Sequence, residues 1–261
     1  MGRNDGSVLA MLRRRGFRVL SHNPTGYLFF PNSKLEDRFF EDALYEMLKK
    51  YSFRIFIRDV IKNRKKFAAS DLLKYSTLEW VERYIAFLLE RGVIEERGSG
   101  QYMLKSEAVF SFGDTLEWFV ASVFERELLS PALWGVRLGG TDAGGDYDVI
   151  AAVENELVYV EVKSSPPKNI EELEVAAFLK RAETLKPAIA VFLEDTRLRM
   201  KDKIVPFFEN AVKERGVEVK RLHNETFSIE DKVFITNSFP DITANISSCV
   251  ERHLMAKGFW R

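Results

Sequence analysis

Apolar residues dominate two neighbouring stretches near the middle of the chain, residues 147–153 and 157–163, which charged residues interrupt only at Asp148, Glu161 and Lys163. Both stretches are rich in β-branched and aromatic side chains, which favour strands. Asn155-Glu156 lies between them and can form a two-residue turn. The pattern predicts two antiparallel strands joined as a hairpin.

The predicted pairing gathers three charged side chains. With Asn155-Glu156 as the loop, Asp148 lies opposite Lys163, and Glu161 shares their face because residues two apart on a strand point the same way. A register slip of one residue would scatter the three side chains. Two carboxylates beside one ammonium group suit a hard divalent cation such as Mg²⁺.

The elements expected around this hairpin alternate between helix and strand. The apolar spacing predicts a helix that Asp114 caps, a strand at 133–138, a helix at 170–185 after Pro166-Pro167, and a buried strand at 188–193. Helices between strands on a sheet with a hairpin indicate an α/β fold with a mixed sheet flanked by helices.

This order and these residues resemble the PD-(D/E)XK nuclease superfamily, which has a restriction endonuclease-like core. Asp148 matches the family's Asp, and Glu161-Val162-Lys163 matches its Glu-x-Lys. The resemblance implies hydrolysis of a phosphodiester with Asp148, Glu161 and Lys163 as catalytic residues. It also implies Mg²⁺ as the cofactor, with Mn²⁺ able to replace it.

Further residues near this motif have two interpretations. The resemblance makes Glu117 a third metal ligand, but Glu117 can equally serve in a capping box at its helix start. Asp148 is favoured over Asp146 as the ligand. Lys180 and Arg181 can contact a phosphate backbone, although a charged helix face is usually just solvated. Zinc and cysteine catalysis are disfavoured, because the three His are dispersed and Cys249 is alone.

Residues 35–107 follow the pattern of a winged helix-turn-helix domain. Ser33 with Glu36 is expected to start a helix that runs through Lys50; further helices are expected at 55–63, at 69–73 and from Ser76 to 91. A hairpin turned by Gly98-Ser99-Gly100 would form the wing. The residues expected to bind DNA are Lys62, Arg64, Lys65, Lys66 and Arg83.

The helix that would enter the DNA groove is not basic. Its outward side chains, among them Glu79, Trp80 and Arg83, are mixed in charge. A winged helix that contacts protein, or that forms a homodimer, therefore remains an alternative to DNA binding.

The ends of the chain add smaller elements. Residues 1–34 form an N-terminal extension with a helix and two strands, at 17–20 and 26–30, and residues 108–261 form the nuclease-like domain. Beyond 198 the pattern predicts a helix to 215, strands at 217–222 and 233–236, and a closing helix at 242–255.

Charge and composition fit a two-domain globular protein that meets nucleic acid locally. The 261 residues carry 39 Lys and Arg against 39 Asp and Glu, but residues 1–107 have 20 against 14. Neutral overall charge argues against strong non-specific binding. A single Cys and the lack of a long apolar run predict a cytoplasmic protein without a membrane span.

The sequence as a whole predicts a metal-dependent endonuclease that cleaves DNA and is targeted by a winged helix. Two alternatives stay open. The chain can be a DNA-binding regulator with an inactive nuclease fold, or a nuclease that acts on RNA, on single-stranded DNA or on branched DNA.

Overall fold

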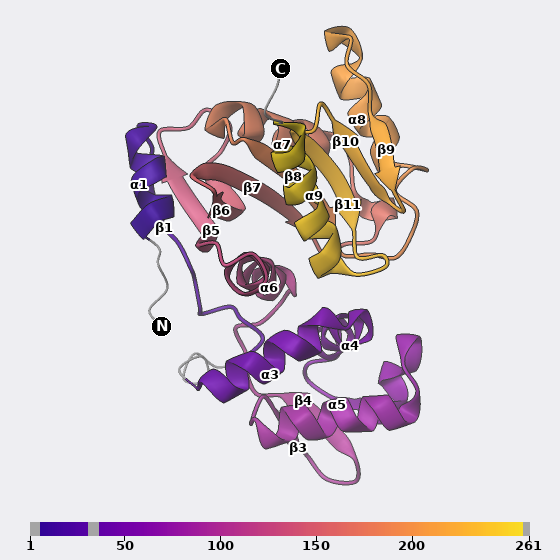
Figure 1. The fold of residues 1–261 in the computed structure, drawn as a ribbon. Coiled ribbons are helices and arrows are strands. Elements are labelled where there is room, and N and C mark those ends of the chain that lie inside the picture. Colours follow the sequence, from indigo (N-terminus) through magenta and orange to yellow (C-terminus); the bar gives the residue numbers. More distant parts are fainter. Residues whose placement is uncertain (1–5, 31–36, 258–261) are drawn as a thin grey trace. The chain divides into compact units, whose positions relative to one another are not determined.

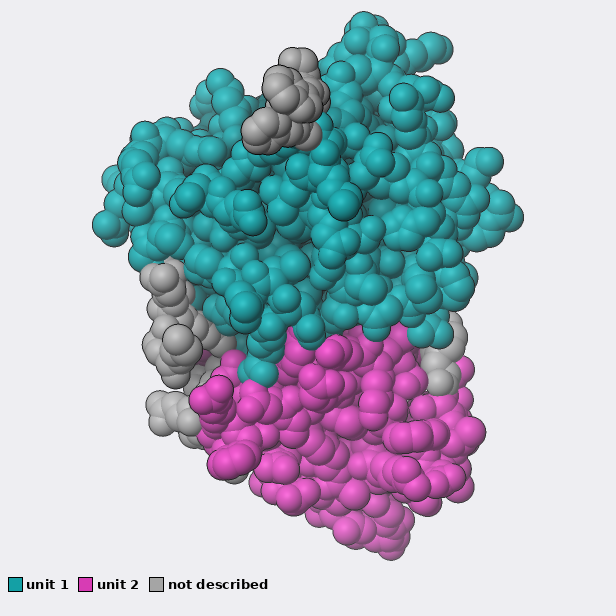
Figure 2. Space-filling view, viewed as in Figure 1, with its two compact units in different colours: residues 1–23, 116–261 teal, residues 24–115 magenta. Residues whose placement is uncertain are grey.

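The computed structural model describes residues 6–30 and 37–257 (Figure 1). The chain divides into two compact units, coloured separately in Figure 2. The large unit comprises residues 1–23 and 116–261, and the small unit comprises residues 24–115. The division differs from the predicted boundaries at 34 and 107, because the beginning of the chain belongs to the large unit.

The large unit is built on one mixed sheet of eight strands in the order β1-β5-β6-β7-β8-β11-β10-β9. Strands β7, β8 and β11 run parallel to one another, and the other pairs are antiparallel. The strands are β1 Arg18–Ser21, β5 Ala132–Gly139, β6 Asp146–Val153, β7 Glu156–Lys163, β8 Ile189–Glu194, β9 Lys220–His223, β10 Thr226–Ile229 and β11 Val233–Asn237. The predicted mixed α/β fold is confirmed.

Helices cover both faces of this sheet (Figure 1). Apolar residues of α1, α7 and α8 join one core cluster with side chains from the strands. Helix α9 packs against β8 and β11 with residues outside that cluster, and so covers the other face. The large unit's helices are α1 Gly6–Arg14, α6 Gly113–Arg126, η2 Pro167–Asn169, α7 Glu172–Leu185, α8 Ile204–Val212, η3 Lys213–Arg215 and α9 Ile242–Ala256.

The small unit places helices beside a sheet of three short strands in the order β2-β4-β3. Its core is aromatic: Phe53 packs edge-on against Tyr84, with ring centroids 5.0 Å apart, and stacks near Phe56. Aromatic pairs of this kind add to the free energy of burying their surface. Its elements are α3 Arg38–Lys49, α4 Tyr51–Lys62, β2 Phe67–Ala68, η1 Ala69–Tyr75, α5 Leu78–Glu90, β3 Ile94–Glu96 and β4 Gln101–Leu104.

Several predicted helix starts differ from those observed. Helix α3 is capped by Asp37, whose carboxylate accepts the Phe39 and Phe40 amides. The predicted cap, Ser33 with Glu36, lies outside the described residues. Helix α5 has Thr77 at its N-cap rather than Ser76. Asp114 lies inside the first turn of α6 and does not precede it.

Two predictions about strands were wrong. Residues 26–30 form turns and bends rather than a strand, although Leu28, Phe29 and Phe30 are buried as a strand's apolar residues would be. The expected partner, β1, instead pairs with β5. Strand β10 was missed, because its four residues lie between two short turns. No helix among the residues that the structure describes is long and apolar enough to cross a membrane.

Candidate active site

The β6–β7 hairpin turns one residue earlier than predicted. Its two loop residues are Glu154 and Asn155, with φ angles of 48° and 63°. Positive φ at both central positions characterises the type I′ turn, whose twist suits a hairpin. Continuing the observed register past Val149, which faces Val160, places Asp148 opposite Glu161 instead of Lys163. The pairing shifts by two residues, so the predicted common face is kept.

Asp148 lies where the ladder between β6 and β7 stops. Paired residues extend only to Val149, and beyond that point the Asp148 side chain takes over: its Oδ2 accepts the Val162 backbone amide at 2.7 Å. This bond fixes the carboxylate beside the end of β7 and satisfies a backbone donor. The half-buried Asp148 is therefore held next to the Glu-x-Lys segment.

Glu161 is the centre of the cluster, and its side chain is buried. Its Oε1 accepts Lys163 Nζ at 2.9 Å and Arg181 Nη2 at 2.7 Å, while Oε2 accepts the hydroxyl of Tyr159. A buried carboxylate is costly unless charged and hydrogen-bonding partners surround it. Two cations and one hydroxyl supply those partners here.

Helix α7 supplies the outer partners of this cluster. Arg181 also donates from Nε to the Tyr159 hydroxyl at 2.9 Å, so its guanidinium bridges two residues of β7. Glu174 Oε1 lies 3.1 Å from Lys163 Nζ, and Glu174 Oε2 accepts the Glu171 amide that begins the helix. Lys163 is thereby held between two carboxylates, one on the strand and one on the helix.

The two central carboxylates have opposite pKa shifts. Burial and the neighbouring Glu161 carboxylate raise the pKa of Asp148 to about 7, against the lowering effect of the Val162 amide. Burial opposes ionisation of Glu161 too, but Lys163 and Arg181 lower its pKa below the usual range. Burial disfavours the charged form of Lys163, yet Glu161 and Glu174 raise its pKa. The cluster therefore holds a charged Glu161–Lys163 pair beside an Asp that ionises with difficulty.

The carboxylates of Asp148 and Glu161 are oxygen donors of the kind that divalent cations prefer. Two carboxylates repel each other across adjacent strands, and a cation between such groups relieves that repulsion. Glu161 would have to release Lys163, Arg181 or Tyr159 to give an oxygen to the metal. Within residues 6–30 and 37–257, no group of three or more His, Cys, Asp or Glu side chains is placed to hold a metal ion.

The structure therefore gathers only part of the predicted ligand set. Asp148, Glu161 and Lys163 converge, whereas Glu117 on α6 does not form a group of three with the two carboxylates. Asp146 is exposed and lies 2.9 Å from Arg137, an ordinary surface pair. Arg181 was predicted only as a candidate contact to a phosphate backbone. Tyr159 could have been predicted as a member of this cluster, because it lies two residues before Glu161 on the strand and so shares its face.

The residues predicted to bind DNA lie at two places in the small unit. Lys62, Lys65 and Lys66 are exposed at the end of α4 and in the turn that follows. The half-buried Arg64 places its guanidinium 4.1 Å from the centre of the Phe110 ring. Arg83 lies on α5, where it pairs with Glu79 at 2.6 Å. The first three form an exposed basic turn, while Arg83 is a separate feature.

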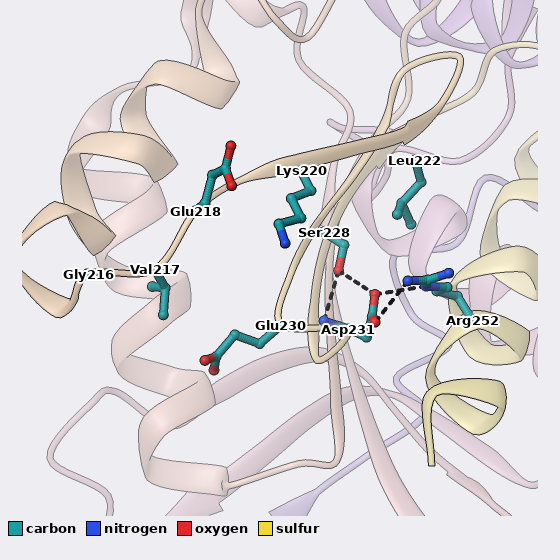
Figure 3. A pocket seen from close by; sticks show the side chains of 9 residues that line it. All are labelled: Gly216, Val217, Glu218, Lys220, Leu222, Ser228, Glu230, Asp231 and Arg252. Atoms are coloured by element: carbon teal, nitrogen blue, oxygen red, sulfur yellow. Dashed lines mark hydrogen bonds and ion pairs between the residues drawn. The ribbon is translucent and has the colours of Figure 1, made fainter. Parts of the chain in front are cut away.

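The large unit has a hollow that contains none of the predicted site residues. The hollow measures about 380 Å³ and lies along β9 and β10, beside Arg252 of α9 (Figure 3). Two of its charged groups pair: Arg252 contacts both oxygens of Asp231, at 2.9 and 3.1 Å, and lowers the pKa of Asp231. Ser228 completes the network. The hollow offers no convergent group for chemistry.

Comparison with solved structures identifies proteins of similar fold. The chain resembles protein VC1899 from Vibrio cholerae with a TM-score of 0.52 at 13% identity, over 96% of this chain and 61% of that one. The likeness shows a shared fold. A structure of Can2 from Sulfobacillus thermosulfidooxidans in complex with cyclic tetra-adenylate gives a TM-score of 0.45 at 15% identity, over 95% and 59%. A TM-score of this size does not establish a shared fold.

The chain thus spans about three fifths of the length of either protein. No model of a protein family matches the sequence, and no curated protein matches it.

Proposed function

We propose that the large unit is a metal-dependent nuclease of the PD-(D/E)XK type that hydrolyses phosphodiester bonds in DNA. The observation that carries the proposal is the convergence of Asp148, Glu161 and Lys163 where β6 and β7 part. The strands hold these groups rigidly, and two of them are carboxylates that a cation can bridge. Such a group of residues needs no nucleophilic side chain, because water can serve.

In this proposal Asp148 and Glu161 would hold Mg²⁺, which Mn²⁺ could replace, and Glu117 is the candidate for a further ligand. When bound, the ion would make a water more acidic and would neutralise charge on the phosphoryl oxygens. Lys163 orients the water or stabilises the negative charge that develops in the transition state. Glu174 keeps the Lys163 ammonium beside the carboxylates, since it lies 3.1 Å away on α7.

The small unit is proposed to be a winged helix that brings DNA to the large unit. Helix α4, the 3₁₀ turn η1 and helix α5 precede the β3–β4 hairpin, which is the element order of that module. Lys62, Lys65 and Lys66 offer exposed charge for phosphates. A homodimer would present two such turns, and dimerisation through the same module is the competing use.

Cleavage assays test the proposal directly. The protein is incubated with plasmid, single-stranded and branched DNA and with RNA, in Mg²⁺, Mn²⁺ or EDTA. We expect metal-dependent cleavage that Asp148→Ala and Lys163→Ala each reduce by about 10²- to 10³-fold or more, as for loss of a transition-state partner. Asp146→Ala is the matched control, because its carboxylate lies outside the cluster. Cleavage that survives both substitutions would contradict the assignment.

One observation favours a second candidate, a DNA-binding regulator with an inactive nuclease fold. Both Glu161 oxygens already carry partners, namely Lys163, Arg181 and Tyr159. A carboxylate committed in this way is a poorer metal ligand. Binding of DNA without cleavage of any substrate in either metal would support this candidate over the nuclease.

A further inference from the structure

One tryptophan on α5 is exposed, unlike the two other tryptophans that the structure describes. Trp80 keeps 41% of its surface exposed, whereas Trp118 and Trp134 are buried. Two cations lie near its ring: Lys50 Nζ is 5.2 Å and the Arg83 guanidinium carbon 4.9 Å from the ring centre. Tryptophan is the best partner for cations among the aromatic residues, so the three groups form one unit.

This unit borders an open groove in the small unit. The groove measures about 530 Å³, which lies within the ~300–1,000 Å³ common for small-ligand sites. Hydroxyl groups line the rest of it. The lining residues are Lys50, Ser52, Ser76, Thr77, Trp80 and Tyr84.

The wall behind Trp80 is rigid. Tyr84 is buried, and its hydroxyl is 2.9 Å from the hydroxyl of Ser52 on the neighbouring helix. Its ring centre is 5.9 Å from Trp80 and 5.0 Å from Phe53 in the core. Trp80 therefore packs on a buried aromatic residue and keeps part of its surface exposed at the groove, so a ligand would not have to order it first.

The cations beside the Trp80 ring are complementary to the negative charge of a polynucleotide. An unpaired base presents a flat face that stacks on an aromatic side chain, while the phosphates that flank it seek cations. Lys50 lies close enough to the ring to meet such a phosphate. Arg83 pairs with Glu79 at 2.6 Å in an exposed setting, where an ion pair is weak and exchangeable.

We propose that Trp80, Lys50 and Arg83 form a binding site for an unpaired nucleotide, with the base stacked on Trp80. Unpaired DNA and unpaired RNA share this chemistry. Paired bases do not, because their faces are covered by neighbouring bases in the duplex. The inference rests on the proposed function for the class of ligand, and it narrows the substrate to one with a single-stranded segment.

The test is binding measured in EDTA, so that cleavage plays no part. Labelled oligonucleotides of DNA and RNA are titrated by fluorescence anisotropy in three forms: single-stranded, duplex, and single-stranded with abasic sites in place of bases. We expect the single strand to bind more tightly than the other two forms. Trp80→Ala should weaken its binding by about 5- to 150-fold, the range for loss of one stacked base.

Two variants complete the design. Trp80→Phe keeps an aromatic face and should retain most of the affinity. Phe39→Ala is the matched control, since Phe39 is an exposed aromatic residue of α3 outside the groove. Circular dichroism checks that each variant is folded.

The inference is overturned if Trp80→Ala binds the single strand as well as the native protein does. It is also overturned if the abasic strand binds equally well, which would leave charge alone, or if no oligonucleotide binds. Cleavage is measured separately in Mg²⁺. If Trp80 makes no contribution to binding while cleavage is normal, the nucleotide site is contradicted and the nuclease proposal stands. If Trp80 contributes to binding but no substrate is cleaved, the nuclease proposal is contradicted and the nucleotide site stands.

Discussion

The two charged clusters of this protein lie in opposite surroundings. Around Glu161, in the large unit, a buried carboxylate is held by two cations and a tyrosine hydroxyl on rigid elements. Around Trp80, in the small unit, two cations lie beside an aromatic ring that remains open to solvent. The first cluster satisfies its charges inside the protein, whereas the cations of the second lie at the surface, where Arg83 has only an exposed ion pair with Glu79.

Burial changes how much a charged group contributes to the free energy of unfolding. Ion pairs in solvent contribute at most about 1 kcal/mol, but breaking a buried pair leaves a charge with no compensation. We therefore expect substitutions around Glu161 to change stability as well as any activity. Substitutions around Trp80 should change binding and leave stability nearly untouched.

The largest effect is expected from Glu161→Ala. The substitution removes a buried carboxylate and leaves the half-buried cations of Lys163 and Arg181 without it, so the free energy of unfolding should fall by about 3–5 kcal/mol. Chemical denaturation measures it. Asp146→Ala breaks the exposed pair with Arg137 and should cost less than about 1 kcal/mol. Equal losses in the two variants would remove the contrast between buried and exposed pairs.

A dependence on pH should follow from Asp148. Its pKa is raised in the folded state to about 7, so the native protein binds more protons than the unfolded chain between about pH 4 and 7. The free energy of unfolding of the metal-free protein should therefore decline as the pH rises through this window. The decline should be about 4 kcal/mol, given about three pKa units at ~1.4 kcal/mol each.

Asp148→Asn is the control for that dependence, because an amide cannot ionise. Its unfolding free energy should vary less over the same range. A native protein whose stability rises from pH 4 to 7 as steeply as the variant's would show that Asp148 ionises normally.

Arg181 tests whether the contacts of Glu161 compete with a metal ion. Arg181→Ala removes one cation from Oε1 and should strengthen Mn²⁺ binding by about tenfold, or ~1.4 kcal/mol. Isothermal titration calorimetry measures the affinity without any substrate. Arg137→Ala serves as the control, since that side chain contacts Asp146 outside the cluster. Weaker binding in the Arg181 variant would show that the guanidinium organises the ligands instead.

The smallest effect is expected at the exposed basic turn of the small unit. Replacing Lys65 and Lys66 by Gln should weaken DNA binding and make its salt dependence shallower by about 2 in the double-logarithmic slope, ~0.9 per phosphate contact. Lys213 and Lys220, exposed in the large unit, make a matched control pair. An unchanged slope would favour a protein-contact role for the small unit.

The sequence predicted the face of the hairpin better than its turn. The loop lies at Glu154 and Asn155, both at positive φ. A glutamate seldom adopts this conformation, so the sequence did not indicate that Glu154 would be a loop residue. The error changed the residue opposite Asp148 but moved the pairing by two positions, so every side chain stayed on its predicted face. Alternation with a period of two is robust to such a slip.

Contacts between distant elements were beyond the reach of the pattern. Arg181 was predicted only as a weak phosphate contact, because nothing in its helix shows that it faces Tyr159 and Glu161. Leu173 on α7 and Leu78 on α5 continue the apolar repeats of their helices, yet they are 76% and 49% exposed. Helical spacing fixes which residues share a side, and packing decides how much of that side is covered.

The pairing of β1 with β5 has a consequence for how the chain assembles. About 120 residues separate Arg18 from its partner Gly139, and the whole of the small unit is threaded between them. Strand β1 is synthesised before its partner β5, and the whole small unit is made between them. A flexible loop of that length is costly to close, but the cost grows only slowly with length, and a folded insert holds its two ends in place. We therefore expect the small unit to act as an internal clamp, whose prior folding lets the edge strand of the large unit dock.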